Sequence, residues 1–181
     1  MKTFFISIFM MMTFIIDAQT FETDLPDDFA SISLEFDLFG SLDKEGINTV
    51  LSVNRVDFEV VDWNIQLQTL FNGDGLEEGW TLTYLDLQAG VGVMFPISPR
   101  ITFTPGIHGG VLLRPKNIVE HPSYTGFAGY MIYGVTSKGR WWLGKTKKLA
   151  ITVSGAYDYA PDVKGKWGRI NGRAGFEYII D

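Results

Sequence analysis

The chain contains no cysteine among its 181 residues. This absence excludes disulfide bonds, and it also excludes a lipoprotein anchor, which requires an acylated N-terminal cysteine. Attachment to a membrane would therefore have to come from the fold. Basic residues are also few, since 15 Lys and Arg oppose 21 Asp and Glu and give a net charge of -6. This balance argues against nucleic acid as a partner.

Long apolar runs are missing after residue 20, so the rest of the sequence predicts no membrane helix, which takes about 20 such residues. One shorter run lies near the N-terminus, where Lys2 precedes the mostly apolar stretch Phe4 to Ile16 and Ala18 stands before Gln19. This pattern predicts a cleaved signal peptide over residues 1–18, followed by a short extension over residues 19–29. A buried core helix is the competing interpretation, which the lack of a polar face disfavours.

The clearest pattern in the remaining chain is the segment TYLDLQAGVGVMF, from Thr83 to Phe95. Every second residue from Leu85 to Phe95 is apolar, and the positions between them are polar or small with one charge, Asp86. Because side chains of a strand alternate between its two faces, the segment predicts a strand with one apolar and one weakly charged face. Membrane barrels show this pattern, with lipid outside and a polar lumen inside.

Similar alternation recurs along the chain and predicts further strands. The segment 47–61 is irregular, because Leu51 and Val53 lie in one phase and Val56 lies in the other. Either the strand bulges or turns near Asn54 and Arg55, or residues 44–53 form a helix. The two faces of segment 126–143 also stay unassigned. The predicted strands cover residues 31–39, 47–61, 63–71, 83–95, 101–113, 126–143, 149–159 and 169–180.

Eight strands result if the irregular segment ends in a turn near Val61 and Asp62. Eight is the smallest number that closes a membrane barrel, and side chains fill an interior of that width. The sequence therefore predicts an all-β protein, an eight-stranded antiparallel up-and-down transmembrane β-barrel over residues 30–181, which is too narrow for bulk porin traffic. A strand of thirteen residues tilted by about 40° rises about 33 Å, enough to cross the apolar band.

The solvent outside the barrel is inferred from the polar faces, because a soluble lipocalin-like barrel has the same strand count. Strands that face water usually carry frequent Lys and Glu. The polar faces here are mostly Gly, Ser, Thr, Asn and Gln, which suits a filled lumen in which isolated charges find partners. A secreted soluble barrel that binds an apolar ligand, with the faces inverted, stays the alternative. The isolated charges are Glu35, Asp37, Asp86, Asp158, Arg169, Arg173 and Glu177.

All five tryptophans lie at or next to an end of a predicted strand, as in the aromatic girdles of membrane barrels. With both termini in the periplasm, the turns at residues 96–99 and 144–147 are periplasmic. The longer loops at residues 72–79, 115–124 and 160–166 then face outside. We expect Trp80 and Trp167 in the outer girdle and Trp63, Trp141 and Trp142 in the inner girdle.

Three stretches, VGVMFPISPRITFTPG, RWWLGKTKKLAITVSGAYDY and the closing GRAGFEYIID, together with the leader ending Asp17-Ala18-Gln19, resemble a known family. They look like the small outer-membrane β-barrel domain proteins of Gram-negative bacteria, especially of the Bacteroidetes type. The likeness is loose over residues 30–181 and good over residues 83–181. It implies residence in the outer membrane, contact with outer-membrane lipids and lipopolysaccharide, and insertion by the barrel assembly machinery. Members usually end in an aromatic residue, whereas this chain ends Ile180-Asp181.

Few residues suggest chemistry. Glu120, His121 and Ser123 place a base near a hydroxyl in one loop, as in enzymes that modify lipid A, but nothing supplies an oxyanion site. The second histidine, His108, is expected to pack in the lumen beside Thr and Gly. We therefore expect no enzyme, no cofactor, no metal and a monomer.

Two further groups of charged residues stand out in the sequence. The acidic loop residues Asp74, Glu77 and Glu78 fit no calcium-loop signature and are expected to be solvated. A basic group crowds the predicted inner turn, where it would form a snorkelling rim or contact anionic headgroups or cell-wall polymer. This group consists of Lys138, Arg140, Lys145, Lys147 and Lys148.

Overall fold

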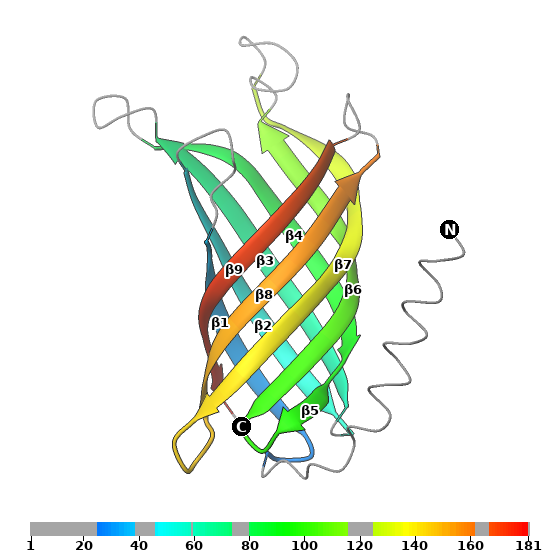
Figure 1. Cartoon of the computed structure of the whole chain (residues 1–181). Helices are drawn as coiled ribbons and strands as arrows, with labels where there is room; N and C mark the ends of the chain where they lie inside the picture. Colours follow the sequence, from blue (N-terminus) through cyan, green and yellow to red (C-terminus); the bar gives the residue numbers. More distant parts are fainter. Residues whose placement is uncertain are drawn as a thin grey trace.

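The computed structural model describes residues 25–38, 46–58, 60–73, 80–115, 125–161 and 167–180. In these ranges the strands form one sheet that closes on itself into a barrel (Figure 1). They contain no helix that is long and apolar enough to cross a membrane. The strands are β1 (Phe29–Asp37), β2 (Gly46–Asp57), β3 (Val61–Gly73), β4 (Trp80–Val93), β5 (Phe95–Ser98), β6 (Ile101–Pro115), β7 (Phe127–Leu143), β8 (Leu149–Ala160) and β9 (Trp167–Ile179).

Closure of the sheet depends on two pairings, β1 with β9 and β4 with β6. All pairings are antiparallel, and every other neighbour in the sheet is also a neighbour in sequence. The short strand β5 follows β4 after Met94 and continues its pairing with β6. Since β5 extends β4, the wall consists of eight strands in up-and-down order. The predicted fold class is confirmed.

The irregular second segment is a single straight strand followed by a short turn. The pairing of β2 with β1 and β3 runs without a register shift through Asn54 and Arg55, so the bulge or turn predicted there is wrong. The helix predicted over residues 44–53 is also wrong from residue 46 onward, and residues 44 and 45 lie outside the described ranges. Val56 breaks the outward apolar pattern because it points into an apolar part of the lumen.

The faces of β7, which the sequence left open, are fixed by its burial. Phe127, Met131, Tyr133 and Val135 are about half exposed and point outward, whereas Ile132 is buried inside. The turn between β5 and β6 is tighter than predicted, since Phe95 to Ser98 pair with β6 and only Pro99 and Arg100 turn. Short turns therefore join β2 to β3, β5 to β6 and β7 to β8 at one rim of the barrel (Figure 1).

Both ends of the described chain meet at this same rim, which we call the short-turn rim. The N–H of Ile180 donates to the carbonyl of Ala30 at 2.9 Å, which places the start of β1 beside the end of β9. Of the predicted longer loops, residues 72, 73, 115 and 160 belong instead to β3, β6 and β8. Apart from Pro161, the rest of these loops lies outside the described ranges, as do the predicted signal peptide and residues 19–24.

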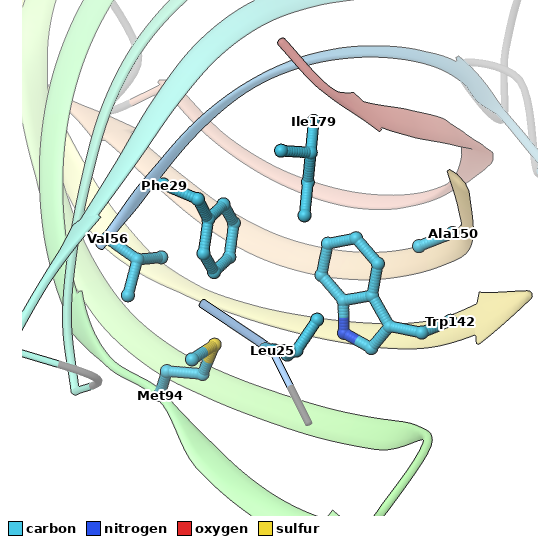
Figure 2. Close-up of a cluster of buried hydrophobic side chains, with 7 residues drawn as sticks. All are labelled: Leu25, Phe29, Val56, Met94, Trp142, Ala150 and Ile179. Atoms are coloured by element: carbon cyan, nitrogen blue, oxygen red, sulfur yellow. The ribbon is translucent and has the colours of Figure 1, made fainter. Parts of the chain in front are cut away.

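Two clusters of apolar side chains fill the ends of the lumen. Near the short-turn rim, Leu25 of the N-terminal segment inserts among side chains from β1, β2, β7, β8, β9 and Met94 (Figure 2). Toward the opposite rim, a second cluster joins Tyr84, Leu112 and Ile132 with their neighbours. The middle of the lumen between these clusters is polar. The first cluster, the inner plug, comprises Leu25, Phe29, Val56, Met94, Trp142, Ala150 and Ile179.

Candidate functional site

The outer face of the barrel is apolar along the strands. Large side chains such as Ile65, Ile107 and Met131 are about 60 % exposed. Among the described strand residues, the outward positions carry only two charges, Arg55 and Asp57, which form an ion pair at the end of β2. Soluble monomers rarely expose a continuous apolar surface of this kind, so the outer face indicates an apolar solvent. The soluble alternative, which requires the apolar faces inside, is wrong.

The lumen contains two clusters of ion pairs, of which the first is centred on Arg140 of β7. Its guanidinium donates to Asp62 Oδ2 at 2.6 Å and to Glu177 Oε2 at 2.9 Å. Lys138, one lumen position further from the short-turn rim, donates to Glu177 Oε2 at 3.1 Å and lies 3.4 Å from Glu35 Oε1. These five charges come from β1, β3, β7 and β9, of which only β1 and β9 pair with each other, so the cluster links strands across the lumen.

The second cluster is centred on Arg169 and Asp158 of adjacent strands. Arg169 pairs with Asp158 and also with Asp86 Oδ2 at 2.8 Å. His108 Nε2 lies 2.7 Å from Asp158 Oδ1, and Asn171 Nδ2 donates to Asp158 Oδ2 at 2.8 Å. The histidine and its aspartate have fully buried side chains. His108 therefore packs in the lumen as predicted, with Gly134 against its ring and Asp158 as its polar partner.

Gln68 extends the second cluster across the lumen. Its Oε1 accepts hydrogen bonds from Arg169 at 2.9 Å and from Arg173 at 2.8 Å, and its Nε2 donates to Asn48 at 3.0 Å. The guanidinium of Arg169 also lies 4.7 Å from the centre of the Tyr84 ring. Such a network leaves buried charges with partners, which burial in a lumen requires.

A polar cavity of about 30 Å³ lies beside the first cluster. A water molecule needs about 10–15 Å³ measured in this way, so the space suits about two waters. Glu35 Oε1, Asp62 Oδ1 and Arg173 Nε are buried without a hydrogen-bond partner among the described residues, and all three residues line the cavity. The cavity is too small for a drug-sized ligand.

The predicted basic rim is corrected by the structure. Lys138 and Arg140 point into the lumen, because they share the inward phase of β7 with Trp142. Lys147 is also buried, and its Nζ donates to the carbonyl of Pro99 at 2.7 Å. Of the predicted group, Lys145 is exposed and Lys148 is half-buried.

The predicted tryptophan girdle is also corrected at one position. Trp63 and Trp141 are about half exposed on the outer face near the short-turn rim, as expected. Trp142 is fully buried, and its ring lies 5.7 Å from that of Phe29 in the inner plug (Figure 2). Adjacent residues of a strand face opposite sides, so both tryptophans of the pair could not lie in the girdle. Trp80 and Trp167 begin β4 and β9, and their side chains lie outside the described part.

Three other predictions concern residues without a described position. The candidate catalytic residues Glu120, His121 and Ser123 lie outside the described ranges, and so do the loop acids Asp74, Glu77 and Glu78. Across the residues that are described, no group of three His, Cys, Asp or Glu side chains is placed to hold a metal ion.

Sequence reasoning missed three lumen charges, Asp62, Lys138 and Arg140. The sequence places Asp62 in a turn, and it places the two cations at a rim because other lysines are near them in the chain. The alternation along β7 could have placed both cations in the lumen. Lys138 and Arg140 alternate with the outward residues Val135, Ser137 and Trp141.

The protein has an apolar outer face, a closed wall of eight strands and a lumen filled with paired charges. These features define its class, the small transmembrane β-barrel. No protein-family model matches the chain, and no curated protein matches it. Among solved structures, it is similar to Neisserial surface protein A, with a TM-score of 0.56 and 11% identity over 84% of this chain and 97% of that one. What is shared at this identity is the barrel fold.

Two further solved structures are similar over most of their length. A de novo designed transmembrane β-barrel matches with a TM-score of 0.46 and 12% identity, over 88% of this chain and 100% of that one. The outer membrane protein Ail of Yersinia pestis, determined in a phospholipid nanodisc, matches with a TM-score of 0.45 and 14% identity, over 84% and 98%.

Proposed function

We propose that this chain is an integral outer-membrane β-barrel protein with a structural, adhesive or envelope-integrity role. The observation that carries the proposal is the sidedness of the wall, with large apolar side chains exposed outside and ion pairs buried inside. An apolar outer band is what lipid requires of a barrel, and closure removes the strand edges that lipid cannot satisfy.

We also propose that the protein is not an enzyme and does not form a wide pore. Support comes from the lumen, where two apolar clusters and two ion-pair clusters leave a cavity of about 30 Å³. Solute traffic needs an open channel, which barrels of this strand number lack. We therefore assign contact with the surroundings to the connections at the rim opposite the short turns, which include the predicted loops at residues 72–79, 115–124 and 160–166.

The proposed partners and processing follow from this location. We infer that residues 1–18 are a signal peptide that is cleaved on export and that the barrel assembly machinery inserts the mature chain. Outer-membrane lipids and lipopolysaccharide then surround a monomer. We also propose that the chain belongs to the Bacteroidetes-type group, which the stretches around residues 91–106 and 140–159 suggest.

Heat-modifiability tests the membrane barrel. The protein folded in detergent should migrate differently on a gel before and after boiling, and it should be extracted from the outer-membrane fraction only with detergent. Recovery in the soluble periplasmic fraction without detergent would refute the proposal. The absence of catalysis is tested separately with His121→Ala, which should leave the lipid A profile of the cell unchanged.

A further inference from the structure

Two exposed cations lie on adjacent turns of the short-turn rim. Arg100 lies in the turn between β5 and β6, and Lys145 lies in the turn between β7 and β8. These residues are far apart in sequence, yet β6 and β7 are neighbours in the sheet. The N–H of Trp142 donates to the carbonyl of Arg100 at 2.8 Å, which fixes the first turn against the strand that leads to Lys145.

Lys147 holds the two turns together at a conformational cost. It has a positive φ of 50° and a buried side chain, and its ammonium donates to the carbonyl of Pro99 at 2.7 Å. A left-handed conformation is unfavourable for a residue other than glycine. Arg100 and Lys145 are the exposed cations of the two turns that this hydrogen bond joins, and Lys148 in the second turn is half-buried.

The apolar outer band reaches these turns without a break. Ile101 pairs with Trp141 across β6 and β7, and Leu143 pairs with Leu149 across β7 and β8. Ile101, Trp141 and Leu149 are 40–54 % exposed and point outward. Indole rings favour the headgroup level of a bilayer, and cations just beyond that level meet the phosphates.

The charges of the rim are divided between its two sides. On the side of β1 and β2, Asp27 and Asp28 are exposed, and Asp28 accepts a hydrogen bond from the N–H of Phe58 at 2.9 Å. Arg55 on that side is already paired with Asp57 at 2.7 Å. An anionic headgroup is therefore attracted to the side of Arg100 and Lys145 and not to the opposite side.

We propose that Arg100 and Lys145 together bind the phosphate of an anionic phospholipid, whose acyl chains lie along the apolar band beside Trp141. The lipid belongs to the leaflet at the short-turn rim, and the site rests on the proposed membrane insertion of the barrel. The two turns form one site because Lys147 holds them in contact.

The test compares lipid selectivity in vesicles of phosphatidylcholine that contain the folded protein. Association of spin-labelled phosphatidylglycerol is measured against that of spin-labelled phosphatidylcholine by electron spin resonance. A cation near an anionic membrane surface contributes about 1 kcal/mol, so Arg100→Gln or Lys145→Gln should lower the selectivity about fivefold and the double variant about twenty-five-fold. The matched control is Arg55→Gln, which removes an exposed cation from the acidic side and should leave the selectivity unchanged.

The outcomes separate this site from membrane insertion itself. Wild-type protein that inserts, shows heat-modifiability and has equal affinity for the two lipids would refute the lipid site and leave the barrel proposal intact. An equal loss in the Arg55→Gln control would also refute it, because the effect would then come from rim charge in general. Failure of the wild-type protein to insert would refute both proposals. Raising the salt concentration should reduce the selectivity of the wild-type protein and change that of the double variant little.

Discussion

The outer and inner faces of the barrel wall are built from one chain, yet they obey opposite rules. On the outer face, apolar side chains from Ile32 to Ile180 are left exposed. On the inner face, Arg140, Asp158 and Glu177 are buried among partners. Trp141 and Trp142 show the contrast at a single step along β7, since the first is 54 % exposed and the second is fully buried. Whether a side chain is exposed or buried therefore depends on which face of the wall it lies on, and not on its residue type.

This difference implies different tolerances to substitution. The outer face accepts changes of apolar shape but not the addition of charge, because lipid cannot solvate a charge. The inner face accepts neither the loss of a charged partner nor extra volume, because its charges and its packing are interdependent. The following substitutions test this division, with the free energy of unfolding measured by urea titration in phosphatidylcholine vesicles.

Arg140→Met should cause one of the largest losses of stability. The change leaves Asp62 without its cation and Glu177 with Lys138 alone. Removing one partner of a buried ion pair costs about 3–5 kcal/mol. Arg55→Gln, which removes one partner of an exposed ion pair, serves as the control and should cost less than about 1 kcal/mol. A loss below about 1 kcal/mol for Arg140→Met would show that water solvates the lumen charges, since removal of an exposed pair has an effect of that size.

Trp142→Ala and Trp141→Ala compare the two faces at neighbouring positions. Trp142 packs against Phe29 and donates from Nε1 to Thr102 Oγ1 at 3.3 Å, so its truncation opens a cavity in the inner plug. Loss of a buried tryptophan costs about 3–5 kcal/mol. Trp141→Ala should cost less, because that ring leaves a surface that lipid can refill. Equal losses would mean that the outer ring is as tightly packed as the inner one.

Leu87→Lys tests the solvent on the outer face. Leu87 lies halfway along β4 and is 55 % exposed. A lysine facing lipid at the midplane costs about 2–4 kcal/mol, whereas the same change on a water-facing strand would have little effect. Leu87→Met preserves the apolar character and should be nearly neutral. A neutral Leu87→Lys variant would contradict the proposed lipid exposure.

Gly134→Ala and Gly139→Ala compare the room on the two sides of β7. A methyl group at Gly134 would collide with the carbonyl of Tyr157 and lie 2.7 Å from His108 Nε2, which disturbs the pair with Asp158. Overpacking of this kind costs about 1–3 kcal/mol. A methyl group at Gly139 would meet only the carbonyl of Val153 at 3.6 Å, so the change should stay within about 0.5 kcal/mol of wild type. The opposite order would show that the lumen has spare volume near His108.

The fold was predictable because one signal, the two-residue period, recurs in nearly every strand. It located the lipid-facing residues of β4, β6, β8 and β9 correctly, as in the series from Leu85 to Phe95. It failed where the lumen is apolar. Val56 and Trp142 belong to the inner plug, so both faces of the wall are apolar at these positions. Apolar and polar residues then no longer alternate, and the two faces cannot be told apart from the sequence.

For the candidate site, the sequence predicts which kinds of residue lie in the lumen but not how they pair. The sequence indicated that charges such as Glu35, Arg169 and Glu177 would lie in the lumen, but it could not indicate their partners. The pairs depend on the stagger of distant strands, which places Lys138 of β7 within reach of Glu35 of β1. Lys138 and Arg140 were misplaced because their neighbours in sequence are lysines of a turn, whereas their neighbours in space are carboxylates.

The pairing of β1 with β9 has a consequence for how the protein is made. Ser31 donates to Glu177 at 2.6 Å across this seam, between residues separated by 146 positions in sequence. Joining residues of such separation costs more loop-closure entropy than pairing strands that are neighbours in sequence. Until the last strand reaches the first, two unpaired edges stay open, and neither can be left in lipid. Closure of the barrel therefore requires β9, because a wall without that strand leaves the edges of β1 and β8 unpaired.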